Sequence, residues 1–483
     1  MHSALIARIL GLLLVVFSFT MIPPVVVAWI YQDEGAGPFM SAFGVIFVLG
    51  LALWLPTFRA EGELQTREGF LVVTLFWLVL GLSGALPLIF HEGLALSFTD
   101  AAFESISGLT TTGASILSGI DNLPHSLLFY RQQLQWLGGM GVIVLAIAIL
   151  PMLGVGGMQL YRAEIPGPMK ESKLTPRIAE TAKALWYIYL SLTIVCGLAY
   201  WWAGMGPFDA ICYAFSTIAT GGFAPHEASL AYFDNAAIDW IGAGFIFLAS
   251  CNFGLHFAAW RSRSLVAYGL DPEFRFFVGI SLIYVLIVSC TLYWFNTEGS
   301  GMAALRHSVF QVLSFSTGTG LVSSTPGNWP LFVPYLLVMA SFLGGCAAST
   351  AGGMKVVRGA LMFHQGQREL RRLIYPTGVF ALRFGQRPVD EDVLRAVAGF
   401  VAVYILVAVV ATLLLTGSGL DMDTAVSATA ASLNNLGVGI AGVAGGYSHL
   451  ADWAKWLMCL LMLLGRLEIF TLLVLFTPMF WRQ

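Results

Sequence analysis

Charged residues are scarce in this chain. Asp, Glu, Lys and Arg make up 11% of its 483 residues, apolar residues make up 58%, and the mean hydropathy is +0.80. Soluble globular proteins carry about 25% charged residues, so this composition excludes a soluble fold. Apolar stretches of about 20 residues, the length that crosses a bilayer, recur along the whole chain. The chain is therefore expected to be a polytopic membrane protein.

Motifs of soluble cofactor chemistry are also missing. The chain has no Gly-x-x-x-x-Gly-Lys-Ser/Thr loop and no strand-led Gly-x-Gly-x-x-Gly fingerprint, so nucleotide control must come from another protein. The cysteines form no Cys-x-x-Cys pair, which argues against zinc and a disulfide scaffold, and we expect small buried hydrophobes. The six are Cys196, Cys212, Cys251, Cys290, Cys346 and Cys459. His226, His256 and His307 lack metal-ligand spacing and are interpreted as structural. The net charge of −3 gives no indication of a nucleic-acid partner.

Ten membrane-spanning segments are expected, with both termini in the cytoplasm. They cover residues 8–31, 39–58, 69–91, 132–153, 184–204, 236–258, 275–295, 332–363, 393–416 and 452–480. The first is too long for the core of a signal peptide. In this topology 20 of the 24 Lys and Arg residues lie inside, as the positive-inside rule requires. The exceptions are Arg131, Arg306 and Lys455 near the outer face and Arg466 inside the last span.

Four shorter, half-apolar stretches lie between pairs of spans, and each ends in a segment with glycine. Aligned on that glycine, the segments are Thr111-Thr112-Gly113, Ala219-Thr220-Gly221, Ser316-Thr317-Gly318 and Asn435-Leu436-Gly437. The glycines are 108, 97 and 119 residues apart, about the length of a helix, pore helix, filter and helix. One such segment alone is an ordinary packing feature of membrane helices. Four at similar spacing predict four related units around one pore.

The residue types in these segments suit a dehydrated monovalent cation. Rings of backbone carbonyls replace the hydration shell of such an ion without placing full charges in the membrane. Glycine permits the backbone conformations that turn carbonyls toward an axis, and Thr and Ser add hydroxyl oxygens. Irregular backbone at membrane depth is tolerated only where it is buried in protein or lines a cavity. The segments are therefore candidate ion-coordinating filters.

The expected fold is an all-α polytopic membrane protein with two N-terminal helices followed by four helix, pore-helix, filter and helix repeats around one pore. The expected divisions are 1–68 for the N-terminal extension, 69–160 for repeat one, 161–264 for an inside loop and repeat two, 265–372 for repeat three with an intramembrane loop, and 373–483 for an inside loop and repeat four.

Over essentially its full length the chain resembles the TrkH branch of the Trk/Ktr/HKT superfamily of potassium uptake proteins. In that family glycine at the first Gly position of every filter accompanies potassium selectivity, and members with serine in repeat one tend to favour sodium. The resemblance implies that K⁺ is the transported ion, and that Gly113 favours potassium over sodium. It also implies ion-coordinating carbonyls at the residues before each aligned glycine, Thr111, Thr112, Ala219, Thr220, Ser316, Thr317, Asn435 and Leu436. The fourth filter, with Asn435 and Leu436 where others have hydroxyls, departs most from the pattern.

A run of small residues from Gly344 to Lys355 should break the eighth span, because it lacks the side chains of a stable lipid-facing helix. The alternative interpretation is a close helix-packing face. The resemblance favours an intramembrane loop beneath the filter that acts as a gate. Its expected gate residues are Gly345, Ser349, Gly352, Gly353 and Lys355.

Arg466 lies mid-way along the last expected span, where a charge is costly and usually faces water or a partner. Snorkelling or a structural pair with Glu468 would explain it. The resemblance implies instead that Arg466 projects into the pore below the filter and opposes cation passage. Glu468 is then its expected local modulator.

Three acidic residues, Asp100, Glu104 and Asp209, fall in or just before the expected pore helices on the outer side. They would add negative potential at the ion entrance or cap helices, and capping is the preferred interpretation for Asp100 and Asp209.

The resemblance implies a bacterial inner-membrane location, a homodimer with one pore per protomer, and a cytosolic nucleotide-binding TrkA-like regulatory subunit. The basic inside stretches 161–183 and 363–392 would face such a partner, or only satisfy the topology rule and bind anionic lipid. Two other functions make different predictions for the sequence. A proton- or sodium-coupled symporter working by alternating access predicts two related halves rather than four quarters. A membrane enzyme needs convergent nucleophiles, carboxylates or metal ligands, which the spans hardly offer, so no enzymatic activity is expected.

Overall fold

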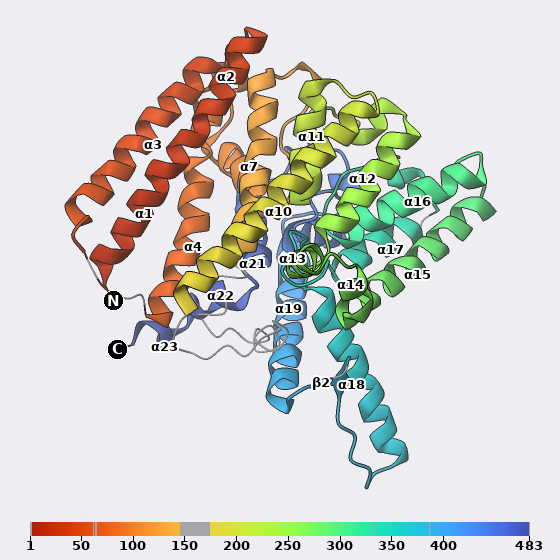
Figure 1. Cartoon of the computed structure of the whole chain (residues 1–483). Coiled ribbons are helices and arrows are strands. Elements are labelled where there is room, and N and C mark those ends of the chain that lie inside the picture. Colours follow the sequence, from red (N-terminus) through yellow and green to blue (C-terminus); the bar gives the residue numbers. More distant parts are fainter. Residues whose placement is uncertain are drawn as a thin grey trace.

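Helices form almost all the regular structure in the computed structural model of the chain, which describes residues 2–60, 62, 65–144, 174–330, 332–385 and 387–482. They pack as a bundle of tilted helices, from which α18 (Val356–Ile374) extends toward the side where both termini lie (Figure 1). Within the described ranges the only sheet is an antiparallel hairpin of β1 (Arg383–Phe384) and β2 (Arg387–Pro388). The expected all-α architecture is confirmed. We call the end of the bundle at which both termini lie the inner end, and the opposite end the outer end.

Two long helical segments precede the rest of the bundle. They consist of α1 (Ser3–Ser18), η1 (Phe19–Met21) and α2 (Ile22–Tyr31), followed by α3 (Ala36–Thr57). The backbones of α1 and α3 approach closely at glycines: a Cβ on Gly50 would lie 2.8 Å from the Val15 nitrogen and 3.0 Å from the Gly11 oxygen. Small residues allow this approach, so the pair packs by close backbone contact.

The remaining elements form four units, each with a short helix after its first long one. Unit one contains α4 (Thr66–Ser83), α5 (Leu86–Phe90), η2 (Glu92–Leu94), α6 (Phe98–Leu109), η3 (Ile120–Asn122) and α7 (His125–Val144). Unit two contains α10 (Leu174–Trp202), α11 (Pro207–Ala219), η5 (Ser229–Phe233), α12 (Ala236–Ala249) and α13 (Phe253–Ser262), with α14 (Val266–Leu270) leading on. Unit three contains α15 (Pro272–Trp294), α16 (Gly301–Ser316), η6 (Pro326–Asn328), α17 (Phe332–Ser341) and α18. Unit four contains α19 (Glu391–Gly417), α20 (Met422–Leu433), η7 (Ala441–Val443), α21 (Asp452–Arg466), α22 (Phe470–Leu473), η8 (Val474–Phe476) and α23 (Pro478–Trp481).

Six helices among the described residues are long and apolar enough to cross a membrane, and two bent pairs bring the number to eight. The six are Ser3–Tyr31, Ala36–Thr57, Arg67–Phe90, Ala182–Trp202, Pro272–Trp294 and Glu391–Gly417. The bent pairs are α12 with α13, at 93°, and α21 with the helical segment Phe470–Phe476, at 112°. Two of the ten expected spans remain. The described part of 132–153 lies in α7, and 332–363 is interrupted between α17 and α18.

The bounds of both expected inside loops are wrong. In the stretch 363–392, α18 continues to Ile374. The inside stretch 161–183 was predicted as a loop, but α10 already begins at Leu174, and residues 161–173 lie outside the described ones. The pattern of charges hid this start, because basic residues are compatible with the first turns of a helix as well as with a loop.

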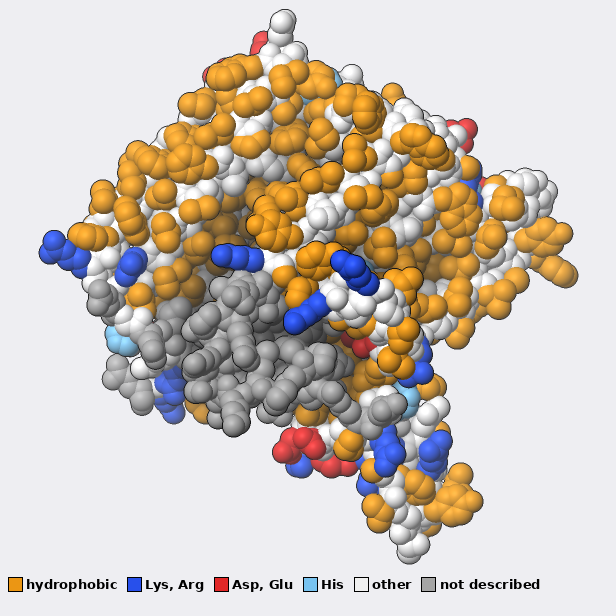
Figure 2. All heavy atoms as spheres, viewed as in Figure 1, with side chains coloured by type: hydrophobic (Ala, Val, Ile, Leu, Met, Phe, Trp, Pro, Cys, Tyr) orange, Lys and Arg blue, Asp and Glu red, His pale blue; other side chains and the backbone are white. Residues whose placement is uncertain are grey.

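Large apolar side chains cover the flanks of the bundle. Figure 2 shows them over most of the visible face, while Lys and Arg gather toward the inner end. Exposed examples on five of the spans are Val16, Val48, Leu198, Leu286 and Leu406. An apolar surface of this extent is not tolerated in water, so these flanks face lipid. Cys290 is exposed on such a flank, whereas the other five cysteines are buried as expected.

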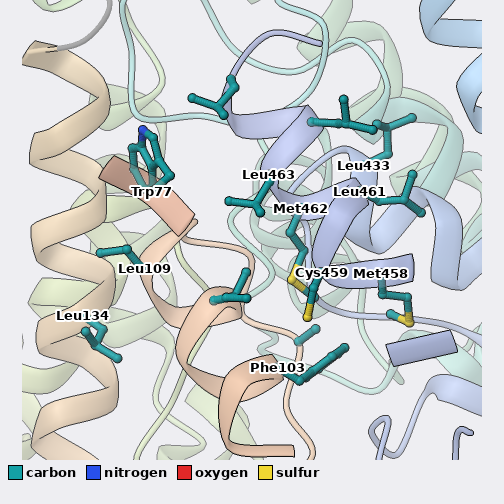
Figure 3. Close-up of a cluster of buried hydrophobic side chains, with 14 of the residues drawn as sticks. Trp77, Phe103, Leu109, Leu134, Leu433, Met458, Cys459, Leu461, Met462 and Leu463 are labelled. Carbon is teal, nitrogen blue, oxygen red and sulfur yellow. The ribbon is translucent and has the colours of Figure 1, made fainter. Parts of the chain in front are cut away.

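The largest buried cluster joins units one and four (Figure 3). Trp77, Phe103, Leu109 and Leu134 from unit one pack in the same cluster as side chains of α20 and α21, including Met458 and Met462. The short helices α6 and α20 are buried along most of their length. The core therefore fixes the segments that follow these helices.

Polar contacts tie neighbouring units together near the outer end. They are His226 with Asp121 (2.8 Å) between units two and one, Arg306 with Asp239 (3.2 Å) between three and two, Lys455 with Asp100 (2.6 Å) between four and one, and Tyr335 with Asp423 between three and four. Two outer cations that departed from the positive-inside rule, Arg306 and Lys455, therefore serve as links between units. All four junctions have such a contact.

The junction between units one and two has a titratable group. His226, in the loop after α11, lies between Asp121 (Nδ1 to Oδ1, 2.8 Å) and Asp209 (Nε2 to Oδ1, 3.3 Å) and stacks on Tyr232, with ring centroids 3.7 Å apart. Burial alone lowers the pKa of this imidazole, but the hydrogen bonds and charges of the two carboxylates outweigh it and the net shift is upward. The structural interpretation of His226 from sequence agrees with this position.

We predict that Gly50→Ala destabilises the chain and that Gly44→Ala, on the same helix, does not. A Cβ at Gly50 overlaps the α1 backbone, whereas nothing lies within 4 Å of one at Gly44. Overpacking costs about 1–3 kcal/mol, while the better helix propensity of alanine contributes up to about 1 kcal/mol at an unhindered site. Thermal unfolding in detergent measures both variants, and equal midpoints would contradict the close packing of α1 on α3.

We also predict that His226 stabilises the fold at low pH. Because its folded pKa is raised, its contribution is fully present below the unfolded value of about 6.5 and is lost as the pH rises through the folded pKa. The difference in melting temperature between the wild type and His226→Gln should therefore shrink from pH 6 toward pH 8 or higher. A difference that stays constant over this range would show that the imidazolium makes no net contribution.

Candidate functional site

The four glycine-containing segments each follow the C-terminal end of a short buried helix. These helices are α6, α11, α16 and α20. Three of them begin with a side-chain cap from Ser97, Ser300 or Asp421, and α11 begins with Pro207 in its first turn. Since a helix carries partial negative charge at its C-terminus, four negative ends meet the segments.

The acidic residues near these helices are all paired. Asp100 and Asp209 were expected to cap helices, but Ser97 and Gly206 occupy the cap positions of α6 and α11. Asp100 instead binds Lys455, Asp209 lies at 3.3 Å from His226, and the buried Glu104 binds Arg131 at 2.8 Å. The carboxylates are therefore neutralised locally, and the capping prediction was wrong because capping depends on one position in the chain that composition does not fix.

The segments share one backbone conformation of three successive positions. The first and third positions have positive φ, and the second does not. The first positions are Thr111 (53°), Thr220 (52°), Gly318 (74°) and Asn435 (51°), and the third are Gly113 (81°), Gly222 (85°), Gly320 (74°) and Gly437 (75°). Positive φ is unusual for threonine, a β-branched residue, and such strained positions concentrate at functional sites.

Hydrogen bonds to the preceding helix establish the same alignment independently. The N–H of each second position donates to a carbonyl five residues earlier. The bonds are Thr112 to Ser107 (2.8 Å), Gly221 to Ser216 (2.9 Å), Thr319 to Ser314 (2.8 Å) and Leu436 to Ala431 (2.9 Å). Each segment is thus fixed to its own helix in the same way.

Side by side, the segments close a ring. A Cβ on each third-position glycine would meet the carbonyl oxygen of the second position in the next unit. The approaches are Gly113 to Gly221 (2.1 Å), Gly222 to Thr319 (2.6 Å), Gly320 to Leu436 (2.1 Å) and Gly437 to Thr112 (2.1 Å). The units therefore follow one another around a common centre in the order one, two, three, four, and unit four meets unit one. Glycine is required here both by its φ and by the lack of space for a side chain.

The structure corrects the alignment of two segments. Sequence placed Gly221 and Gly318 in line with Gly113 and Gly437, but by conformation and contacts the equivalent glycines are Gly222 and Gly320. The expected register was wrong by one residue in unit two and by two in unit three, and Gly222, Thr319 and Gly320 were missed. The signal was present as a second glycine in each segment. Residue types alone do not show which of the two glycines is equivalent to Gly113, because the sign of φ decides this.

Side chains from outside hold the segments in place. Gln135 of α7 donates to the Gly221 oxygen (2.6 Å) and accepts from the Phe223 nitrogen (3.2 Å). Asn435 donates to the Thr112 hydroxyl (3.0 Å), which joins units four and one. Among the residues that the structure describes, no group of three His, Cys, Asp or Glu could hold a metal ion. The oxygens gathered at the ring are backbone carbonyls.

The run of small residues between α17 and α18 is not helical. The expected helix break is confirmed, and the continuous helix-packing face is not formed. The run lies against the inner side of the segments: Gly352 N–H donates to the Thr317 oxygen (3.0 Å), and Gly353 N–H to the Asn434 oxygen (3.1 Å). A Cβ on Gly352 would lie 1.9 Å from the Asn434 oxygen. We call residues 342–355 the intramembrane loop.

Other loop residues attach it to unit two. The Thr350 hydroxyl donates to the oxygens of Ile218 (3.0 Å) and Ala249 (3.1 Å). A Cβ on Gly345 would lie 3.0 Å from the Ser250 oxygen, and Ser349 is buried and donates to the Cys346 oxygen (2.6 Å). The loop is therefore held by hydrogen bonds that a small movement would break together.

Arg466 ends α21 at the bend and reaches the loop. Its Nη1 donates to the Thr350 oxygen (2.9 Å), its Nη2 lies 3.3 Å from the Gly138 oxygen in α7, and 5% of the residue is exposed. This guanidinium joins unit four, the intramembrane loop and unit one. The structure therefore gives Arg466 interior partners, which excludes snorkelling.

Glu468 has a different partner from the expected one. It pairs with Arg358 of α18, whose guanidinium also lies over the Phe400 ring at 4.0 Å. The sequence does not reveal the pair of Arg358 and Glu468, because these residues are 110 positions apart in the chain. Arg466, only two positions before Glu468, was the expected partner. Lys355, at the end of the loop, donates to the Ala351 oxygen and interacts electrostatically with Glu468, Arg466 and Arg358. Lys355, Arg358, Arg466 and Glu468 form one charged group beside the loop.

Comparison with known proteins agrees with this arrangement. The model of the TrkH family, described as a cation transport protein, matches residues 37–483. The Trk system potassium uptake protein TrkH of Salmonella typhimurium is 53% identical over 483 residues, which is 100% of both chains. The Trk system potassium uptake protein TrkG of Escherichia coli K12 is 38% identical over 485 residues, 100% of this chain and 99% of that one.

The fold is similar to that of a solved structure. The crystal structure of the potassium transporter TrkH from Vibrio parahaemolyticus superposes with a TM-score of 0.93 at 49% sequence identity, and the match covers 100% of both chains. The family match over most of the chain and the full-length relatives agree with the resemblance drawn from the filter segments. The chain belongs to the TrkH family of cation transport proteins and is a transporter, not an enzyme.

Proposed function

We propose that this chain is the K⁺-conducting subunit of a Trk-type potassium uptake system. The ring of four glycine-containing segments supports this most strongly, because each third-position glycine faces a carbonyl oxygen of the next unit. Relatives at 53% and 38% identity are named as potassium uptake proteins of the Trk system. Transport of K⁺ by this chain rests on these two observations.

The ring is the selectivity filter in this proposal. Carbonyl oxygens of the first and second positions take the place of the water around K⁺, and four helix C-termini add negative potential without a full charge. By the structural register, the coordinating positions are Thr111, Thr112, Thr220, Gly221, Gly318, Thr319, Asn435 and Leu436. The residues Ala219, Ser316 and Thr317, expected from the sequence alignment, fall one step or more toward the helix ends.

The intramembrane loop and Arg466 form the gate in this proposal. The loop donates backbone N–H groups to the carbonyls of Thr317 and Asn434, each one residue before the first position of its segment, so it lies next to the path of a permeating ion. Arg466 places a positive charge beneath the ring and binds the loop through Thr350. Opening requires that Gly345, Ser349, Gly352, Gly353 and Lys355 move away from the axis, while the Glu468–Arg358 pair holds the start of α18.

The cellular setting follows from the same family. We propose a bacterial inner membrane with both termini cytoplasmic, a homodimer with one pore per protomer, and regulation by a TrkA-like cytosolic nucleotide-binding subunit. The name "Trk system" of the relatives supports a system of several components. The basic helix α18 at the inner end is a suitable contact for a cytosolic partner or for anionic lipid.

Cation flux into proteoliposomes that contain only the purified chain tests the function. Potassium and rubidium flux that exceeds sodium and lithium flux, without an imposed pH gradient, would support a selective pore. Flux that requires a pH gradient or sodium would favour a coupled symporter. Flux that does not distinguish the four cations would contradict the filter.

We predict that Gly113→Ser lowers the potassium-to-sodium flux ratio. A Cβ there would lie 2.1 Å from the Gly221 oxygen and would sit at a φ of +81°, so the ring must distort. Displacement of one coordinating carbonyl should cost about 1.4 kcal/mol of discrimination, or about tenfold. Gly445→Ser is the control, since no atom lies within 4 Å of its Cβ. An unchanged flux ratio in Gly113→Ser would contradict the assignment of Gly113 to the filter.

Arg466→Ala is expected to raise potassium flux several-fold. The change removes both the charge that opposes cations and the bond that holds the loop through Thr350. Arg466→Lys keeps the charge but loses the planar fork, so it separates the two effects. Higher flux in both variants would indicate that the tether dominates, and unchanged flux in Arg466→Ala would contradict the gate.

A further inference from the structure

A buried ion pair lies directly behind the outer ends of two filter segments. Glu104 of α6 and Arg131 of α7 are each 1% exposed, and Arg131 Nε lies 2.8 Å from Glu104 Oε1. Arg131 was the third exception to the positive-inside rule. Isolated ion pairs in such interiors rarely stabilise a fold more than apolar residues of the same volume would. The contacts that the pair makes with the filter segments indicate another role.

Glu104 holds the segment of its own unit. Its Oε2 accepts from the Ile116 N–H (3.0 Å), and both carboxylate oxygens lie within hydrogen-bond distance of the Ser115 hydroxyl (3.0 and 3.1 Å). Ser115 and Ile116 follow Gly113 by two and three residues. The carboxylate therefore fixes the chain where it leaves the ring on the outer side.

Arg131 extends this hold to unit two. Its Nη2 donates to the Ser115 hydroxyl (3.0 Å), and its Nη1 lies 3.3 Å from the Ala224 oxygen. Its guanidinium lies over the Phe223 ring at 4.2 Å. Phe223 directly follows Gly222, the third-position glycine of unit two. One side chain thus contacts the outward continuation of two neighbouring filters.

One turn further along α7, a second side chain also bonds the unit-two segment, at a position closer to the ring. Gln135 lies four residues after Arg131, on the same helix face, and bonds both the Gly221 oxygen and the Phe223 nitrogen. The two side chains together brace the unit-two segment from Gly221 to Ala224. In this way a rigid helix of unit one determines where the carbonyls of unit two lie.

We propose that the Glu104–Arg131 pair positions the first two filter segments and thereby sets the preference for K⁺ over Na⁺. The proposal rests on the proposed function, since it assigns these residues to the filter. Neither group touches the ion. A ring that closes on the smaller Na⁺ needs its carbonyls to move inward, and the pair resists that movement by fixing both segments to α6 and α7.

The test compares two double variants that each remove a complete ion pair and so leave no unpaired buried charge. Glu104→Gln with Arg131→Met removes the pair behind the filter. Asp100→Asn with Lys455→Met removes the matched pair between units one and four. That pair is also an inter-unit contact of α6, but the side chain of Asp100 bonds Lys455 and Ser97 and lies at the far end of α6 from the segment.

Potassium and sodium flux ratios in proteoliposomes and thermal unfolding in detergent are measured for both. The filter pair variant should lose about tenfold in the ratio, the factor that corresponds to one lost charged hydrogen bond. The control variant should melt earlier yet keep a ratio within about twofold of the wild type, because its bonds do not reach the ring. A folded Glu104→Gln and Arg131→Met variant with the wild-type ratio, or an equal loss in the control, would overturn the proposal.

Two further measurements keep the outcome clear. If the wild type itself shows no preference for potassium, the proposed function fails and not this inference alone. If the double variant does not fold, Ser115→Ala removes only the hydroxyl that both charged groups share. It should lower the ratio by about twofold to tenfold at unchanged melting temperature, and an unchanged ratio would overturn the proposal.

Discussion

The arrangement depends on one constraint: non-helical backbone inside an apolar body must have its polar groups satisfied. Four irregular segments and one irregular loop meet at the centre of this bundle. The segments bind their own short helices through their second-position N–H groups, and the loop binds the segments through Gly352 and Gly353. In the proposed function, carbonyls of the first and second positions are then available to a cation. In this proposal, the same physics that limits irregular backbone in membranes produces a site for an ion without any acidic side chain.

Charged residues are arranged differently near the outer end of the bundle and beneath the ring. Near the outer end, each cation of the described residues that departs from the positive-inside rule is paired: Arg131 with Glu104, Arg306 with Asp239 and Lys455 with Asp100. These pairs join or brace units, so they leave little net field at the entrance. Beneath the ring, the cations Lys355, Arg358 and Arg466 lie with the acid Glu468, and a second acid, Glu273, also acts on Lys355, so three cations face two acids and the group is net positive. In the proposed mechanism, a cation therefore meets its main electrostatic barrier below the filter.

Sequence reasoning gave the helical class, the four units, the broken eighth span and the interior position of Arg466, because hydrophobic length, glycine spacing and the cost of buried charge are local properties. It failed where a position is decided by contacts between distant parts of the chain. Gly222 and Gly320, not Gly221 and Gly318, complete the ring, since backbone handedness and the neighbouring carbonyl select them. Glu468 binds Arg358 rather than the nearby Arg466. Neither Asp100 nor Asp209 occupies a cap position: Asp100 pairs with Lys455 of unit four and also bonds the cap residue Ser97, and Asp209 pairs with His226 of its own unit.

Four units in a single chain need not be equal, and this inequality is functional in the proposed mechanism. The second position of the ring is Thr112, Gly221, Thr319 or Leu436, so units two and four differ from units one and three at an equivalent backbone site. Unit one supplies the bracing helix α7, unit three the intramembrane loop, and unit four the arginine that reaches that loop. A ring of identical subunits would place four copies of Arg466 and of the loop on one axis, where they would collide. A single chain can place one of each, and one loop that binds carbonyls of units three and four is enough to close a ring that all four units build.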